Sequence, residues 1–434
     1  MRFTHIASGS YPKRKDETGS NSEPMSNFCS RIIDFLCLKR GIAALLAMAI
    51  LVGTGEKMAE RFLPIYLLAL GGGAISIGLL NGMDNLLGAL YSFPGGYLSD
   101  KLGYKKALLI FNLVAMAGYT VVILVPTWQA VILGSILFIS WTALSLPATM
   151  SMVSAVLPKN RRTMGVTMHS LVRRIPMALG PVIGGLLIAW YGEKEGVRTA
   201  FVAALVLGFA SLVLQRVFIR EEKQNSSKAV GSPLRMFSFM SKELQNLLIS
   251  DILIRFCEQI PYAFVVVWVM KSNGLGSVQF ALLTTIEMAT AVLTYLPVAY
   301  LADKTTKKPF VVITFVNFTV FPLFLLISHS FPVLLVAFII RGLKEFGEPT
   351  RKALIMDLAP EDMKAGMFGL YYLLRDVVVS FAAFGGAFLW QVSPSTNFVT
   401  AAAFGAAGTI YFAIFGRDLA TVAQPIRKPQ PEKA

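Results

Sequence analysis

Long apolar runs, separated by short polar clusters, follow one another along the whole chain. The first six lie at residues 41–70, 73–98, 107–126, 128–157, 163–190 and 199–219, and a second six at 243–270, 276–300, 309–329, 331–357, 365–390 and 395–416. A helix that crosses the hydrocarbon core of a bilayer needs about 20 mostly apolar residues, and each run meets that length. The pattern predicts an all-α membrane protein with twelve transmembrane helices.

The polar stretch between residues 220 and 242 is longer than any other internal connection and divides the helices into two sets. We therefore expect an N-terminal tail (1–40), a six-helix half (41–219), a linker (220–242), a second six-helix half (243–416) and a C-terminal tail (417–434). The halves resemble each other at offsets of 201 to 203 residues, as Glu56 with Glu258 and Arg174 with Arg375 illustrate. Such parallel repeats predict two pseudo-symmetric halves with a substrate site between them, near the bilayer midplane.

Composition and the placement of charge support a membrane location. Of the residues, 55% are hydrophobic and 15% charged, against about 25% charged in an average soluble protein. The net charge of +15 would suggest nucleic acid binding on a soluble protein, but here most of the excess lies in the tails and in connections that follow even-numbered runs. Connections after odd-numbered runs carry only Lys194, Arg198 and Lys271. The positive-inside rule then places both termini and the linker in the cytoplasm. Because no signal peptide precedes the first run, a bacterial inner (cytoplasmic) membrane is the simplest location.

Ionisable residues inside the apolar runs are the most informative feature of the sequence. One such charge at the bilayer centre costs at least about 2.5 to 3.5 kcal/mol, so each needs a partner, water or a role. Several share a helix face by their spacing: Glu56 and Glu60 in the first run, Asp251, Arg255 and Glu258 in the seventh, and Arg341, Glu345, Glu348 and Lys352 in the tenth. One interpretation is internal ion pairing, for example Asp251 with Arg255 and Arg341 with Glu345. It explains each pair but not the concentration of charges in a few helices.

The other interpretation is functional. A carboxyl group that moves between an apolar and a basic environment can take up and release a proton, which is what coupling to a proton gradient requires. The candidate proton-coupling residues are Glu56, Glu60, Glu258 and Glu345. Planar arginine groups suit carboxylate or phosphate, and the candidate substrate-binding residues are Arg61, Arg174, Arg255, Arg341 and Arg375. Arg174 and Arg375, at matching positions, would clamp an anion between the halves. Asp84 and Glu287 also match each other, and we interpret them as structural.

A family resemblance rests on the connection between the second and third runs. The string from Gly96 to Lys106, GYLSDKLGYKK, resembles the signature G-x-L-a-D-R-x-G-R-[RK] of the major facilitator superfamily (MFS), and the string from Ala299 to Lys308 resembles a weaker copy. The resemblance implies alternating access, gated by Gly96, Asp100, Lys101, Gly103 and Asp303. The string from Gly180 to Gly185, GPVIGG, is similar to the end of a motif of drug antiporters, although small residues equally allow close helix packing.

Together these features predict a secondary transporter, proton-coupled, that moves a small anionic or zwitterionic organic solute. Proton-driven efflux of lipophilic cations is the alternative, followed by a membrane receptor and a membrane-embedded enzyme. The chain lacks a P-loop, an H-E-x-x-H motif and clustered metal ligands, so we expect no enzyme, cofactor or metal site. The expected partners are substrate, protons and the lipid bilayer, with no nucleic acid, and we expect a monomer.

Overall fold

The computed structural model describes residues 40–138, 174–218, 237–304, 306–360 and 364–418, and these contain helices and turns but no strand. The helices of the first half are α2 (Arg40–Glu60), α3 (Leu63–Ala69), α4 (Ala74–Leu102), α5 (Tyr104–Leu124), α6 (Trp128–Phe138) and α9 (Arg174–Phe218). Those of the second half are α11 (Lys242–Tyr262), α12 (Val265–Val267), the wider π-type turn η2 (Trp268–Ser272), α13 (Ser277–Lys304), α14 (Lys308–Leu326), α15 (Phe331–Leu343), α16 (Glu348–Leu358), α17 (Lys364–Val392) and α18 (Pro394–Phe415).

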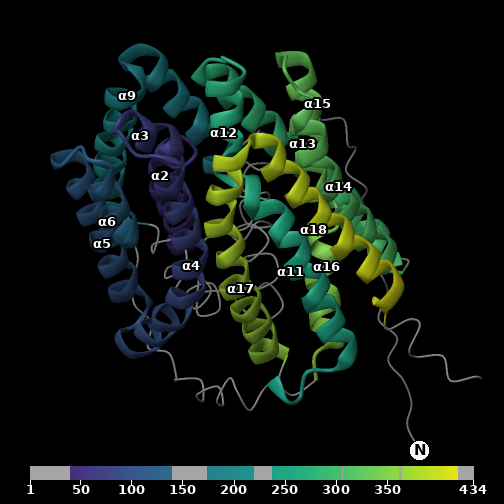
Figure 1. The fold of residues 1–434 in the computed structure, drawn as a ribbon. Coiled ribbons are helices and arrows are strands. Elements are labelled where there is room, and N and C mark those ends of the chain that lie inside the picture. The colour runs from purple at the N-terminus through teal and green to yellow at the C-terminus, as the bar shows by residue number, and fades with distance from the viewer. Residues whose placement is uncertain (1–39, 139–173, 219–236, 305, 361–363, 419–434) are drawn as a thin grey trace, which may run out of the picture.

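The two sets of helices stand side by side as two bundles (Figure 1). Within the described ranges, seven helices are long and apolar enough to cross a membrane. Large apolar side chains on their outer faces are exposed, among them Phe209, Leu293 and Phe381. So many large apolar side chains at the surface are typical of a protein that lipid surrounds. The predicted fold class, an all-α membrane protein of two halves, is confirmed.

Three of the predicted spans are interrupted within the part of the chain that the structure describes. The run at 41–70 breaks at Arg61–Phe62 between α2 and α3, and the run at 243–270 breaks at Ala263–Phe264 between α11 and α12. These two breaks are 202 residues apart and therefore occupy the same place in the two repeats. The run at 331–357 breaks at Lys344–Gly347, where the Gly347 amide donates to Thr314 Oγ1 at 2.6 Å. Interrupted helices within a bilayer are tolerated where protein or a cavity satisfies the freed backbone groups.

One predicted connection is helical instead. The runs at 163–190 and 199–219 continue into each other as α9, which reverses direction at Gly192. The φ of Gly192 is 81°, a left-handed conformation that residues with a side chain rarely adopt. Residues 191–198, expected as a loop, therefore extend the two helices around a single glycine.

The halves contact each other at the end of the molecule where α3 and α12 lie, the upper end in Figure 1. The Phe62 and Phe280 rings meet there with centres 5.5 Å apart, and the Ser277 hydroxyl donates to the Gly185 carbonyl at 2.7 Å. Lys271 pairs with Glu193 at 2.7 Å across the same boundary. These contacts join α9 and the break between α2 and α3 in the first half to η2 and α13 of the second. We call this the α3/α12 end.

Candidate functional site

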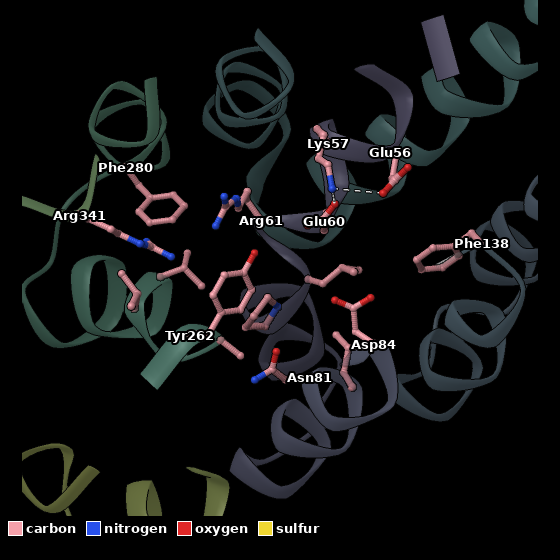
Figure 2. A pocket seen from close by; sticks show the side chains of 16 residues that line it. Glu56, Lys57, Glu60, Arg61, Asn81, Asp84, Phe138, Tyr262, Phe280 and Arg341 are labelled. Atoms are coloured by element: carbon pink, nitrogen blue, oxygen red, sulfur yellow. Dashed lines mark hydrogen bonds and ion pairs between the residues drawn. The ribbon is translucent and has the colours of Figure 1, made fainter. Parts of the chain in front are cut away.

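A cavity of about 220 Å³ lies between the two halves, directly beside the breaks that follow α2 and α11. Helices α2, α3, α4 and α6 of the first half and α11, α12, α13 and α15 of the second contribute side chains to it. Its polar lining consists of Glu56, Lys57, Glu60, Arg61, Asn81, Asp84, Tyr262 and Arg341 (Figure 2). Both halves therefore present charge to one shared space.

Carboxylates gather at the first-half side of the cavity. Glu56 and Glu60 lie on the last turns of α2, and Asp84 faces them from α4 (Figure 2). The Lys57 ammonium group donates to both glutamates, at 3.2 Å to Glu56 and in a short contact to Glu60. Among the described lining residues, three acidic groups and one lysine therefore face the cavity at this side.

Arginines gather at the other side. Arg61 lies in the break after α2 and Arg341 near the end of α15, on the opposite side of the view from Glu56 and Asp84 (Figure 2). Their guanidinium carbons lie 5.4 and 5.6 Å from the centre of the Tyr262 ring, within the range of cation–π contact. Tyr262 thus holds one arginine from each half at the same place. Two arginines thus face the cavity here, and three acidic side chains face it at the Glu56 side.

A network of buried ion pairs lies behind Arg341, within the second half. Arg341 Nε is 3.3 Å from Glu287 Oε1 on α13, and both side chains are almost fully buried. Lys344, in the break after α15, lies 2.6 Å from Glu258 and 3.8 Å from Glu287. Arg255 completes the group at 2.5 Å from the other oxygen of Glu258. Glu258, Arg341, Lys344 and Tyr262 surround a second, very small void next to the central cavity.

A second group of charges centres on Asp251 and joins the first through Arg255, which lies 3.6 Å from Glu348. The Asp251 carboxylate contacts Arg351 and also lies 3.4 Å from Arg375, while Tyr371 donates to it at 3.0 Å. Arg351 pairs in addition with Glu348 at 2.7 Å. The two ion pairs expected within single helices are therefore wrong. Asp251 pairs with Arg351 rather than with Arg255, and Arg341 pairs with Glu287 rather than with Glu345.

Arg174 and Arg375, the matched pair of the two repeats, have different partners. Arg174 pairs with Glu345 at 3.0 Å and so links α9 of the first half to the break in the tenth span. Arg375 contacts its neighbour Asp376 at 2.7 Å and Asp251 at 3.4 Å. Neither arginine belongs to the lining of the central cavity. The clamp of one anion by both arginines stays a prediction that this arrangement does not favour.

Family and structural comparisons agree with this geometry. The family model of the Major Facilitator Superfamily matches the chain over residues 45–257 and again over 247–433. The chain belongs to this superfamily. An uncharacterized MFS-type transporter of Methanocaldococcus jannaschii is 21% identical over 354 residues, which cover 79% of this chain and 87% of that protein. The uncharacterized MFS-type transporter YqjV of Bacillus subtilis is 27% identical over 182 residues, 40% of this chain and 43% of that one.

Solved structures share the MFS fold. A POT family transporter in complex with 5-aminolevulinic acid superposes with a TM-score of 0.73 at 14% identity, covering 89% of this chain and 97% of that chain. A mutant form of the nucleoside transporter NupG superposes with a TM-score of 0.72 at 14% identity, covering 87% of this chain and 100% of that chain. A bacterial homologue of the human lysosomal transporter Spinster, in an inward-facing and unoccupied conformation, superposes with a TM-score of 0.67 at 12% identity. The superposition covers 86% of this chain and 94% of that chain.

The MFS signature occupies the junction of α4 and α5. Lys101 lies in the last turn of α4, and Gly103 separates the two helices with a φ of 84°. The glycine of the signature is thus required by a left-handed backbone. Gly96 and Asp100 lie on α4 and Asp303 on α13, but their side chains lie outside the described residues. Their gating role remains a prediction of the family resemblance.

The GPVIGG string of α9 lies where α9 packs closely on α2. A Cβ added at Gly184 would stand 2.0 Å from the Met58 carbonyl oxygen, and one at Gly180 would stand 2.6 Å from the Lys57 side chain. These glycines set the position of the α2 turn that carries Glu56, Lys57 and Glu60. Close packing therefore explains why glycines occupy these positions of the string.

The sequence predicts the charged residues of the cavity lining better than the neutral polar ones. Glu56, Glu60, Arg61 and Arg341 do meet at one cavity, whereas Glu258 lies behind it, and Arg174, Arg255, Glu345 and Arg375 are not in its lining. Sequence reasoning missed Lys57, Tyr262 and Asn81, and it interpreted Asp84, which also lines the cavity, as structural. Tyr262 carried a signal, because it is the repeat counterpart of Glu60 and follows a proline inside a helix. Asn81 carried none beyond being polar in an apolar run.

Proposed function

We propose that this MFS transporter is a proton-coupled secondary carrier of a small zwitterionic or anionic organic solute. The observation that supports this best is the separation of charge across the central cavity, with arginines from both halves on one side and carboxylates on the other (Figure 2). A zwitterion would place its carboxylate at Arg61 and Arg341 and its amine at Glu56 and Asp84. A simple anion would occupy the arginine side alone.

The physical argument is one of matched charge. A guanidinium group offers several N–H donors in one plane and holds a carboxylate by paired, charge-assisted hydrogen bonds. Arg61 and Arg341 come from different halves, so an anion that contacts both would bind both halves at once. An ammonium group suits the opposite side, where the acidic side chains outnumber the single lysine.

Proton coupling is the second part of the proposal. The predicted proton-coupling residues Glu56, Glu60, Glu258 and Glu345 all lie within reach of a basic side chain. A carboxylate whose basic partner moves away in a low-dielectric site becomes easier to protonate. Rearrangement of Lys57, Lys344 or Arg174 between conformations would therefore couple protonation to transport.

Alternating access is the third part. At the α3/α12 end the halves are held together by the Phe62–Phe280 ring contact, the Ser277–Gly185 hydrogen bond, the Lys271–Glu193 ion pair and the packing of α4 on α17 and of α9 on α13. The exposed ion pair contributes little, about 0 to 1 kcal/mol, so opening this end mainly requires that the packed helices separate. With both termini in the cytoplasm, as the positive-inside rule expects, the α3/α12 end would face the outside.

The experiment that tests the proposal measures current from proteoliposomes adsorbed on a solid-supported membrane. The probes are 4-aminobutyrate as a zwitterion, succinate as an anion and tetraphenylphosphonium as a lipophilic cation, each applied at pH 6 and pH 8. We expect pH-dependent currents with one or both of the first two, and loss of gradient-driven accumulation in Glu56→Gln and Glu258→Gln. The exposed pair of Glu195 with Arg198 offers a matched control, Glu195→Gln, which should behave as the wild type.

Each alternative outcome decides against a part of the proposal. A current with tetraphenylphosphonium alone would favour efflux of lipophilic cations at the carboxylate side of the cavity. Saturable binding of a probe without flux would favour a receptor. Currents that are the same at both pH values and in both glutamine variants would refute proton coupling.

A further inference from the structure

The two carboxylate oxygens of Glu287 have unequal surroundings. Oε1 faces Arg341 Nε at 3.3 Å and Lys344 Nζ at 3.8 Å. Oε2 is buried and has no hydrogen-bond partner, and it is the only carboxylate oxygen in the described part of the chain with both properties. A buried charged oxygen without a donor is costly, whereas a protonated one carries no charge. Oε2 is therefore a ready position for a proton.

Arg341 is the cation nearest to Glu287. Glu258 is paired with Lys344 and Arg255, while Glu287 faces Arg341 at 3.3 Å and Lys344 at 3.8 Å, with Arg61 of the first half also nearby. The charged side chains on other elements packed against α13 have partners of their own: Arg174 with Glu345, Lys271 with Glu193, and Glu348 with Arg351. If Arg341 turns to another anion, Glu287 loses its nearest cation.

Arg341 is placed to make that exchange. It lines the central cavity and at the same time contacts Glu287, which is not in the cavity lining. A carboxylate that enters the cavity thus meets a guanidinium group already bonded to an internal carboxylate. The two acids would compete for one cation.

We propose that Glu287 takes up the transported proton when the substrate carboxylate draws Arg341 away from it. The substrate carboxylate accepts hydrogen bonds from Arg341, which stays protonated, and Glu287 Oε2 takes up one proton that enters with the substrate from the solution on the open side, forming a neutral carboxylic acid. One negative charge enters and one proton compensates it. When the substrate leaves, Arg341 returns to Glu287 and the proton departs. This inference rests on the proposed function and specifies its coupling residue.

The other candidate carboxylates are less suited to this role. Both oxygens of Glu258 are engaged, one by Lys344 at 2.6 Å and the other by Arg255 at 2.5 Å. Glu56 and Glu60 share Lys57, a lysine on their own helix, whereas a substrate carboxylate is expected to recruit arginines. Of these groups, only Glu287 has both features: one carboxylate oxygen without a hydrogen-bond donor, and the other oxygen paired with an arginine that lines the cavity.

The first test reads the proton itself and needs no substrate. Infrared difference spectra of the full-length protein are recorded for the wild type, Glu287→Gln, Arg341→Gln and the double variant. Acid titration of the wild type should reveal the carbonyl band of a protonated carboxylic acid that Glu287→Gln lacks. In Arg341→Gln, which imitates a displaced arginine, this band should already be present at neutral pH, and the double variant should lose it. Identical titration spectra for the wild type and Glu287→Gln would overturn the proposal.

The same four proteins also provide a control for folding. Removal of one partner of a buried ion pair leaves an uncompensated charge, whereas removal of both does not. The double variant should therefore be more stable to heat than Arg341→Gln, with Glu195→Gln as a surface control. Should Arg341→Gln not fold, the titration of the wild type against Glu287→Gln still decides.

The second test uses transport of 4-aminobutyrate or succinate, whichever gives a current. Glu287→Gln should lose accumulation driven by a pH gradient, while exchange of labelled for unlabelled probe at equal pH continues. Accumulation at the wild-type level would overturn the role of Glu287 even though the transporter works. If no probe is transported, the proposed function fails, and the infrared titration still reports whether Glu287 binds the proton.

Discussion

The contact between α4 and α17 gives a sharp prediction about the movement of the two halves. Gly78 and Gly82 lie one turn apart on α4 and face α17 of the other half, in the G-x-x-x-G spacing that lets two membrane helices approach closely. A Cβ added at Gly78 would stand 2.4 Å from Ala387 Cβ and 3.2 Å from the Phe384 carbonyl oxygen. Because Ala387 Cβ and the Phe384 carbonyl cannot turn aside, the helices themselves must separate in Gly78→Ala.

The magnitude follows from the cost of overpacking. One extra methyl group in a tightly packed interface costs about 1 to 3 kcal/mol. Since α4 and α17 belong to different halves, the cost falls on the conformation in which they touch, and it shifts the equilibrium away from that conformation by about 5 to 150-fold. Within α4, alanine favours the helix over glycine by about 1 kcal/mol, so the first half itself should not be weakened.

The assay is a spin-label distance measurement between Leu124 at the end of α5 and Gln391 near the end of α17, both exposed. Gly78→Ala should raise the population of longer distances at this end of the molecule. The matched control is Gly88→Ala on the same helix, where no described atom lies within 4 Å of the added Cβ. Equal distance distributions in the wild type and both variants would refute the reasoning, because the interface would then accept a methyl group without opening.

Three further predictions concern the charged residues. Arg351→Gln should lower the free energy of unfolding by about 3 to 5 kcal/mol, since it leaves the buried Asp251 carboxylate without its main partner, and thermal unfolding in detergent measures this. Asp100→Asn should slow turnover more than it weakens substrate binding, which a comparison of initial rates with equilibrium binding of the transported probe checks. In the same binding assay Arg174→Ala and Arg375→Ala should both reduce affinity if they clamp the anion, and unchanged affinity in both would dismiss the clamp.

The architecture is readable from the sequence because lipid imposes a simple rule. Every spanning segment must be long, apolar and internally hydrogen-bonded, so apolar runs and the 202-residue repeat suffice to predict two sets of helices. The breaks within the predicted spans cannot be predicted from the sequence in this way. The residues that follow the Arg61–Phe62 break are as apolar as the rest of the span, and a hydropathy pattern does not record where a backbone leaves its helix. The loss of this information matters, because that break carries Arg61 into the cavity.

Ion-pair partners are the second limit. Spacing predicts which residues share a helix face, and on that basis it matches Asp251 with Arg255 and Arg341 with Glu345. The structure pairs Asp251 with Arg351 of α16 and Arg341 with Glu287 of α13. These partners lie on different helices, and the spacing of residues in one sequence does not predict which helices pack against each other. Tertiary packing also explains why Glu287, interpreted from the sequence as structural, emerges as the candidate coupling residue.

The repeat finally explains why the two halves play unequal parts. Glu56 and Glu258 are counterparts, as are Asp84 and Glu287, yet the first-half members line the cavity and the second-half members are held by Arg341, Lys344 and Arg255. The difference can be traced to the tenth span: at an offset of 202, Arg341 and Lys344 correspond to Ile139 and Thr142, which carry no charge. The carboxylates that line the cavity can attract a cationic group directly, whereas carboxylates locked to arginines respond only when an anion competes for those arginines. On this argument the first half binds the amine of a zwitterion, and the second half converts binding of its carboxylate into proton uptake.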